Sequence, residues 1–282
     1  MNRTLLPLAA MCAAVALAAS AAAGGQEPAA NGRIEFAVRV TPVSGQPEPA
    51  RGLTIFLLSR SFREISREAE EKIPRPDLDA YIDTLAAGKE LKDWMKKQHS
   101  VTITGADFRK RLTDDDLIRV PEFLEAYVKG NLLELTLGFP PPKSTPEERA
   151  EMSKNHGGYP KAYVVQIRKY LTAHPESRAP MDTILEEQDA TKPWTIQESR
   201  WHERAHTLAL QLAQSDYLAS KTVTNLDGLG AFQAAPGKYW LSSLDGEALG
   251  GEQHLRWDVA VEVRAGSVAR VDLTNLNAEK KP

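Results

Sequence analysis

The sequence predicts an α+β fold, in which both ends of the chain form one antiparallel β-sandwich and the middle is an inserted α-helical subdomain. Near both ends, apolar residues alternate with polar ones, which is the pattern of half-buried strands. Between residues 59 and about 218 the apolar residues follow the spacing of amphipathic helices instead. Neither end carries enough strands for a sandwich of its own, so we expect the two ends to meet in space.

The first 23 residues are predicted to be a secretory signal peptide and not part of the fold. Arg3 supplies a positive charge, residues 5–19 form an Ala-rich apolar run, and residues 20–23 are small enough for cleavage. The run is shorter than the ~20 residues of a membrane-spanning helix, so we expect no stable transmembrane span after cleavage. Cys12 is the only cysteine, so the mature chain would contain no disulfide. These features predict an exported protein, periplasmic or extracellular.

The composition excludes several classes of protein. The chain has 282 residues, 42% of them hydrophobic and 26% charged, which is ordinary for a globular protein and excludes a collagen or a disordered polyanion. Its 35 Lys and Arg residues are balanced by 38 Asp and Glu residues. Because there is no excess of positive charge, we expect no nucleic-acid partner.

Two strands are expected before the helical block. Residues 33–40 alternate, which places one apolar set on the same face: Ile34, Phe36, Val38 and Val40. Residues 41–52 are rich in turn formers, and residues 53–58 form the second predicted strand. We expect the inserted block to leave the sandwich after residue 58.

Helix signals mark the block that follows. Thr113, followed by three aspartates, predicts an N-cap and a helix that runs toward Val128 and ends at Gly130. A threonine, a proline and two glutamates at 145–148 predict another helix start. The clearest helix is expected from 194 to about 218, where apolar residues keep a heptad-like spacing.

The strand pattern returns at about residue 222. A turn is expected at Asn225–Gly228, where Asn225 would form an Asx-type turn, and another at 235–237. The strand after the second turn is expected to pair back with the strand before it. The predicted C-terminal strands are 222–224, 231–233, 238–242, 255–263 and 267–273.

Two stretches near the C-terminus carry motifs. Residues 224–241 are similar to the pattern "T-x-x-D-G-x-F … P-G-x-Y-x-L", and residues 263–273 are similar to "V-x-x-G-x-x-x-x-V-x-L". With the first hairpin at residues 33–58, these motifs resemble carboxypeptidase regulatory-like domains, which belong to the prealbumin-like (transthyretin-related) β-sandwiches. The resemblance implies a prealbumin-like sandwich made of residues 33–58 plus 221–277, with residues 59–220 as an inserted helical subdomain. This sequence departs from the pattern by that insertion and by extra residues between Gly228 and Phe232.

One motif in the last predicted helix suggests catalysis. Residues 201–206 read Trp-His-Glu-Arg-Ala-His and contain HExxH. On a helix, His202 and His206 would share a face and could bind Zn²⁺, with Glu203 as the general base. Arg204 is charged where zinc proteases usually have an uncharged residue, and no third ligand follows at the usual spacing. The alternative is two histidines at the edge of an amphipathic helix.

Two functions follow from these features. The first is an exported, non-enzymatic binding or accessory protein without a cofactor, whose partner is a protein, peptide or glycan outside the cytoplasm. In the family that the ends resemble, such modules commonly act as scaffolds or contact domains attached to peptidases and receptors. The second is a zinc-dependent hydrolase that uses His202, Glu203 and His206.

Overall fold

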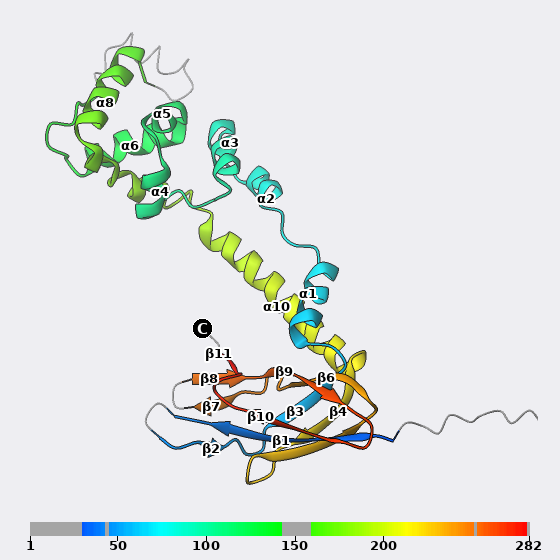
Figure 1. Cartoon of the computed structure of the whole chain (residues 1–282). Coiled ribbons are helices and arrows are strands. Elements are labelled where there is room, and N and C mark those ends of the chain that lie inside the picture. The colour runs from blue at the N-terminus through cyan, green and yellow to red at the C-terminus, as the bar shows by residue number, and fades with distance from the viewer. Residues whose placement is uncertain (1–29, 43–44, 143–158, 251–252, 281–282) are drawn as a thin grey trace, which may run out of the picture. The chain divides into compact units, whose positions relative to one another are not determined.

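In the computed structural model the chain has a mixed α+β architecture and divides into two compact units (Figure 1). The structure describes residues 30–42, 45–142, 159–250 and 253–280, so the predicted signal peptide lies outside the described residues. The β unit contains the chain up to Leu57 and from Ala219 onward. The helical unit runs from Leu58 to Leu218. These boundaries lie close to those expected, after residues 58 and 220.

Strands from both ends of the chain form three sheets in the β unit (Figure 1). The first sheet is built around the N-terminal strand and contains β1 (Gly32–Val40), β2 (Glu48–Pro49), β5 (Leu229–Ala234) and β10 (Val268–Leu273). The second contains, in spatial order, β4 (Leu218–Val223), β3 (Thr54–Leu58), β6 (Gly237–Ser242) and β9 (Asp258–Val263). The small third sheet contains β7 (Ala248–Gly250), β8 (Gln253–Arg256) and β11 (Glu279–Lys280).

The alternation of the first strand is confirmed, because its apolar set is buried. Ile34, Phe36, Val38 and Val40 all lie in the core of the β unit. Ile55 and Leu57 of β3 and Leu241 of β6 belong to the same core, so the first and second sheets bury their apolar faces together. The expected meeting of the chain ends is also confirmed, since β1 lies between β5 and β10.

The purely antiparallel arrangement that was expected is wrong for one pair of strands in the first sheet. β1 pairs with β5 in antiparallel fashion, but it pairs with β10 in parallel, with Ile34 opposite Ala269 and Val38 opposite Leu273. The strand before β10 is β9, which lies in the second sheet. The chain therefore crosses from one sheet to the other before β10, and such a crossover allows β10 to run in the direction of β1.

The expected hairpin across residues 235–237 is wrong. β5 pairs with β1, whereas β6 pairs with β9, with Tyr239 opposite Val261. The turn at Pro236 and Gly237 therefore joins two different sheets. The alternation of a strand shows which face is buried, but it does not identify the strand that lies beside it.

The single strand expected at 255–263 is divided at Trp257. β8 ends at Arg256 and β9 begins at Asp258, and the two strands pair in different sheets. Trp257 is buried, and its indole Nε1 donates a hydrogen bond to the carbonyl oxygen of Thr274 at 3.0 Å. The chain changes sheets at this residue, where the bulky side chain fills the core.

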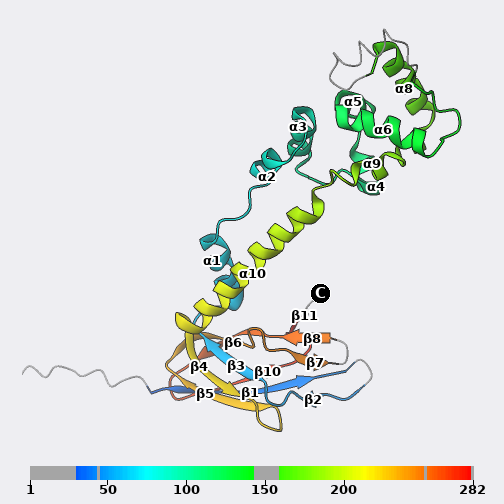
Figure 2. The same cartoon turned by 180° about the vertical axis from the view of Figure 1, so that it is seen from behind.

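The helical unit consists of short helices and one long one. Its helices are α1 (Phe62–Lys72), α2 (Leu78–Thr84), α3 (Lys89–Gln98), α4 (Gly105–Arg111), α5 (Asp114–Arg119), α6 (Pro121–Leu133), α8 (Lys161–Ala173), the 3₁₀ turn η1 (Pro175–Arg178), α9 (Met181–Leu185) and α10 (Thr191–Ser215). Figure 2 shows α1 alongside α10. In the described part of the chain, no helix combines the length and the apolar character that crossing a membrane requires.

The helix expected from Thr113 to Gly130 is two helices. The cap is confirmed, because the Thr113 hydroxyl accepts a hydrogen bond from the backbone N–H of Asp116 at 3.0 Å. However, α5 ends at Arg119 and α6 begins at Pro121, which has no N–H to continue the first helix. Gly130 lies inside α6, where an added Cβ would clash with the carbonyl oxygen of Pro180. This glycine therefore permits close helix packing and does not end the helix.

The longest helix is confirmed with shifted ends. α10 begins at Thr191, three residues before the expected Trp194, and ends at Ser215. Leu218, the expected helix end, is already the first residue of β4. The helix start predicted at 145–148 lies outside the described residues.

Asp189 joins two segments at the start of α10. Its Oδ2 accepts hydrogen bonds from the Ile103 N–H at 3.1 Å and the Thr104 hydroxyl at 2.9 Å, and its Oδ1 accepts from the Thr191 N–H at 2.8 Å. Burial alone would raise the pKa of this carboxyl, but the hydrogen bonds from Thr191, Thr104 and Ile103 outweigh burial and lower its pKa below the usual value.

We expect Asp189→Ala to lower the free energy of unfolding by about 2–3 kcal/mol at pH 7, because it leaves partly buried N–H groups without acceptors. A carboxyl whose pKa is lowered on folding stabilises the protein above its unfolded pKa of about 4 and loses that effect as the pH falls through its folded pKa. Urea titrations at pH 7 and pH 3 should therefore show a smaller difference between wild type and variant at pH 3. A difference that does not change with pH would contradict this role for the carboxylate.

Candidate functional site

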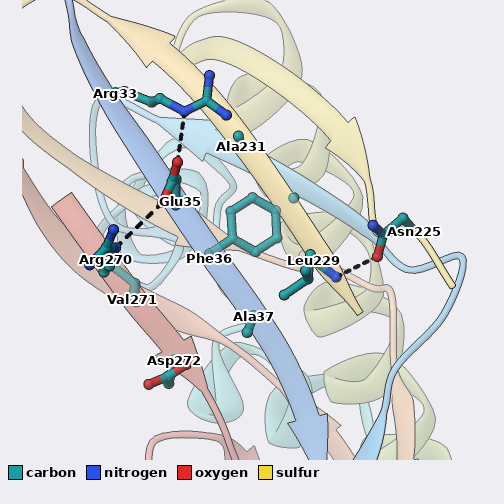
Figure 3. A pocket seen from close by; sticks show the side chains of 11 residues that line it. Arg33, Glu35, Phe36, Ala37, Asn225, Leu229, Ala231, Arg270, Val271 and Asp272 are labelled. Atoms are coloured by element: carbon teal, nitrogen blue, oxygen red, sulfur yellow. Dashed lines mark hydrogen bonds and ion pairs between the residues drawn. The ribbon is translucent and has the colours of Figure 1, made fainter. Parts of the chain in front are cut away.

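A hollow of about 520 Å³ lies on the face of the first sheet that points away from the core. The polar residues of β1, Arg33 and Glu35, alternate with its buried residues, so they project to this outer face. Small residues of β1 and β5 line the hollow: Ala37, Gly230 and Ala231. The hollow combines strands from both ends of the chain, as Figure 3 shows. Its lining residues are Arg33, Glu35, Phe36, Ala37, Asn225, Leu229, Gly230, Ala231, Arg270, Val271 and Asp272.

Two arginines share one carboxylate at the edge of the hollow (Figure 3). The Arg33 Nε lies 3.0 Å from one oxygen of Glu35, and the Arg270 Nε lies 3.4 Å from the other. Arg270 and Glu35 are opposite each other in the β1–β10 register. The three side chains are 40–82% exposed, so these ion pairs contribute little stability. Their net charge is positive, and the guanidinium groups keep further N–H donors for a carboxylate.

Asn225 fixes the other end of the hollow. Its Oδ1 accepts hydrogen bonds from the backbone N–H groups of Asp227 at 2.9 Å and Leu229 at 2.8 Å, which confirms the Asx-type turn. Gly228 has a φ of 72°, a left-handed conformation that an L-residue adopts only with strain. The turn thereby sets the position of Leu229, the residue at which β5 begins.

Sequence reasoning missed this hollow. Arg33 and Glu35 belong to an ordinary solvent-facing set, and Arg270 is far away in the chain, so only the register of β1 and β10 brings them together. One available signal was the alanine at position 37, which occupies the outward, polar set of the β1 alternation. Gly230 and Ala231 on the neighbouring strand are a second.

The HExxH residues lie on the exposed side of α10. His202, Glu203 and His206 are all exposed, and the two histidines are one helical turn apart. The His206 ring lies 6.1 Å from the ring of Phe62 on α1, in an edge-on arrangement. The His202 ring lies 4.6 Å from that of its neighbour Trp201.

A tetrahedral zinc site requires a third protein ligand beside the two histidines. In the part of the chain that the structure describes, no three His, Cys, Asp or Glu side chains come together in a group that could hold a metal ion. Glu203 lines a shallow depression of about 370 Å³ with Pro76, Arg200 and Arg204. The structure thus places the motif on a helix, as predicted, and brings no further ligand from the described residues to it.

No protein-family model, curated protein or solved structure matches this chain. The resemblance of residues 33–58 and 221–277 to carboxypeptidase regulatory-like domains therefore rests on the sequence motifs alone.

Proposed function

We propose that this chain is an exported, non-enzymatic binding protein, in which a carboxypeptidase regulatory-like sandwich presents the hollow on its outer face to a partner outside the cytoplasm. The observation that carries the proposal is the hollow itself, with its floor of small residues and its Arg33–Glu35–Arg270 edge. A concave surface with a few convergent polar groups is the usual form of a binding site.

The chemistry of the lining favours a peptide segment of a partner protein. The two guanidinium groups suit a carboxylate side chain, and the space beside Ala231 and the exposed Leu229 suits an apolar one. Among the described residues that line the hollow, Phe36 is the only aromatic one, and it is 3% exposed, so it offers no open ring face for stacking a sugar. We therefore expect an acidic peptide and not a glycan.

Binding to an array of synthetic peptides, each with one Asp or Glu beside an apolar residue, tests this proposal. The peptides that bind best are then measured by calorimetry. Arg270→Glu reverses a charge at the edge, and Ala231→Trp fills the hollow, so each should weaken binding at least about tenfold. Arg264→Glu is the matched control, because Arg264 is also exposed and also pairs with a glutamate, Glu262. The proposal would be contradicted if all three variants bound the peptides as tightly as wild type does. It would also be contradicted if the wild-type protein bound glycans on an array but none of the peptides.

The zinc-hydrolase alternative rests on the two histidines of α10 and has its own test. Elemental analysis of the purified protein should find no stoichiometric zinc, and peptide substrates should remain intact. Stoichiometric zinc, together with cleavage that is lost on chelation and in Glu203→Gln, would replace the binding proposal with the hydrolase.

A further inference from the structure

Leucine side chains project into solvent from the C-terminal end of α6 and from the segment that follows it. Leu133, Leu135 and Leu137 are 66%, 86% and 94% exposed, respectively. We call residues 132–137 the leucine loop. Single exposed apolar residues are common on protein surfaces, but a group of them in one short segment indicates an interaction site.

The end of this loop is fixed to the helical core. Phe139 is buried, and its ring packs edge-on against the Tyr170 ring at 5.3 Å. The Tyr170 hydroxyl donates a hydrogen bond to the carbonyl oxygen of Leu137, and the Tyr163 hydroxyl donates one to that of Pro140, both at 2.9 Å. The fold therefore holds the backbone in place while the leucine side chains stay outside.

Leu135 is in an unfavourable backbone conformation as well as an exposed one. Its φ is 54°, in the left-handed region that glycine or asparagine usually occupies. The backbone N–H of the next residue, Thr136, donates to the Asn131 carbonyl oxygen at 3.0 Å, which closes the end of α6. A leucine at this position costs conformational energy and returns no burial to the described fold, which points to a role outside it.

We propose that the leucine loop inserts into the surface of a lipid bilayer. The protruding side chains are aliphatic, and the transfer of leucine into the hydrocarbon of a bilayer is favourable. Fluid lipid chains can also surround side chains of any arrangement. Protein–protein hot spots are instead enriched in Trp, Tyr and Arg, and leucine is under-represented there.

The charge of the loop specifies the kind of membrane. Glu134 is the only charged residue between 130 and 142. The loop itself lacks the cluster of basic residues through which anionic lipids attract a protein, and the nearest cations in the sequence are the single residues Lys129 and Lys143. We therefore expect binding to uncharged phosphatidylcholine vesicles, with little change between 0.1 and 0.5 M salt.

Vesicle flotation tests this proposal with the chain from Gly24 onward, which retains every described residue and contains no cysteine. Wild-type protein should float with phosphatidylcholine vesicles, and the double variant Leu135→Asp/Leu137→Asp should lose at least about tenfold in partitioning. The matched control is Leu226→Asp/Leu276→Asp, which changes leucines of the β unit that are 74% and 98% exposed. The control should float like wild type.

A fluorophore on Leu137→Cys gives a second readout, and its emission should shift to the blue when vesicles are added. The loop variant should also keep the thermal stability of wild type, because its changed side chains are exposed. Absence of wild-type flotation, equal flotation of the loop variant, or a requirement for anionic lipid would overturn the proposal. A destabilised loop variant would also overturn it, because the leucines would then pack against this chain itself. A wild-type dimer that the loop variant converts to a monomer would overturn it too, because the leucines would then contact a second copy.

Discussion

Replacement of Trp257 by alanine should lower the free energy of unfolding of the β unit by about 3–5 kcal/mol. The side chain is 1% exposed, so its loss leaves a large cavity in the core that the two sheets share. It also removes the indole hydrogen bond to the Thr274 carbonyl oxygen, which becomes a buried acceptor without that donor.

Urea unfolding followed by far-ultraviolet circular dichroism measures this effect. Trp240→Ala is the matched control, because Trp240 on β6 is only partly buried and its ring faces the Lys238 ammonium at 4.9 Å. We expect the control to lose less than half as much stability as Trp257→Ala. Equal losses of unfolding free energy in the two variants would contradict the assignment of Trp257 to the core.

Replacement of Phe123 by alanine should destabilise the helical unit by a similar amount, about 3–5 kcal/mol. Phe123 on α6 is fully buried, and its ring lies 5.0 Å from that of Trp94 and 5.4 Å from that of Phe108. This aromatic cluster connects α3, α4 and α6, so a cavity there weakens the packing of all three helices.

Differential scanning calorimetry shows which unit each substitution affects. Phe123→Ala should lower the melting temperature of the helical transition and leave that of the β unit in place, whereas Trp257→Ala should do the reverse. Leu133→Ala is the control for the helical unit, because this residue of α6 is exposed and should change stability by less than about 0.5 kcal/mol. If both substitutions lowered one common transition, the two units would unfold together.

Burial could be predicted from the sequence, because the spacing of apolar residues along a strand or helix directly reflects which face is buried. The inward set of β1, from Ile34 to Val40, is one example, and the capping hydroxyl of Thr113 is another. The pairing of strands was harder to predict, since β5 and β6 carry no local signal that they belong to different sheets. The role of Gly130 was hidden for a similar reason, because its partner Pro180 is distant in the chain.

The candidate site shows the same division between local and distant information. The HExxH spacing placed His202 and His206 on one helix, but whether a third ligand converges on them depends on the tertiary fold. The hollow combines Glu35 with Arg270, and only the parallel register of β1 and β10 brings them together. A binding surface built across strands from both chain ends is not visible as a motif in either end.

Deletion of the helical block tests most directly whether the chain ends form a β unit on their own. The Ser59 N–H donates to the Tyr217 carbonyl oxygen at 2.9 Å, so the two ends of the block are adjacent. A short Gly/Ser linker can therefore replace residues 60–216, and a shorter loop reduces the entropy cost of closure by only about 0.6 kcal/mol per halving of its length. We expect the deletion protein to give a β-type circular dichroism spectrum and one cooperative thermal transition. An unfolded deletion protein would show that the helices complete the core of the β unit and would contradict the division of the chain into two units.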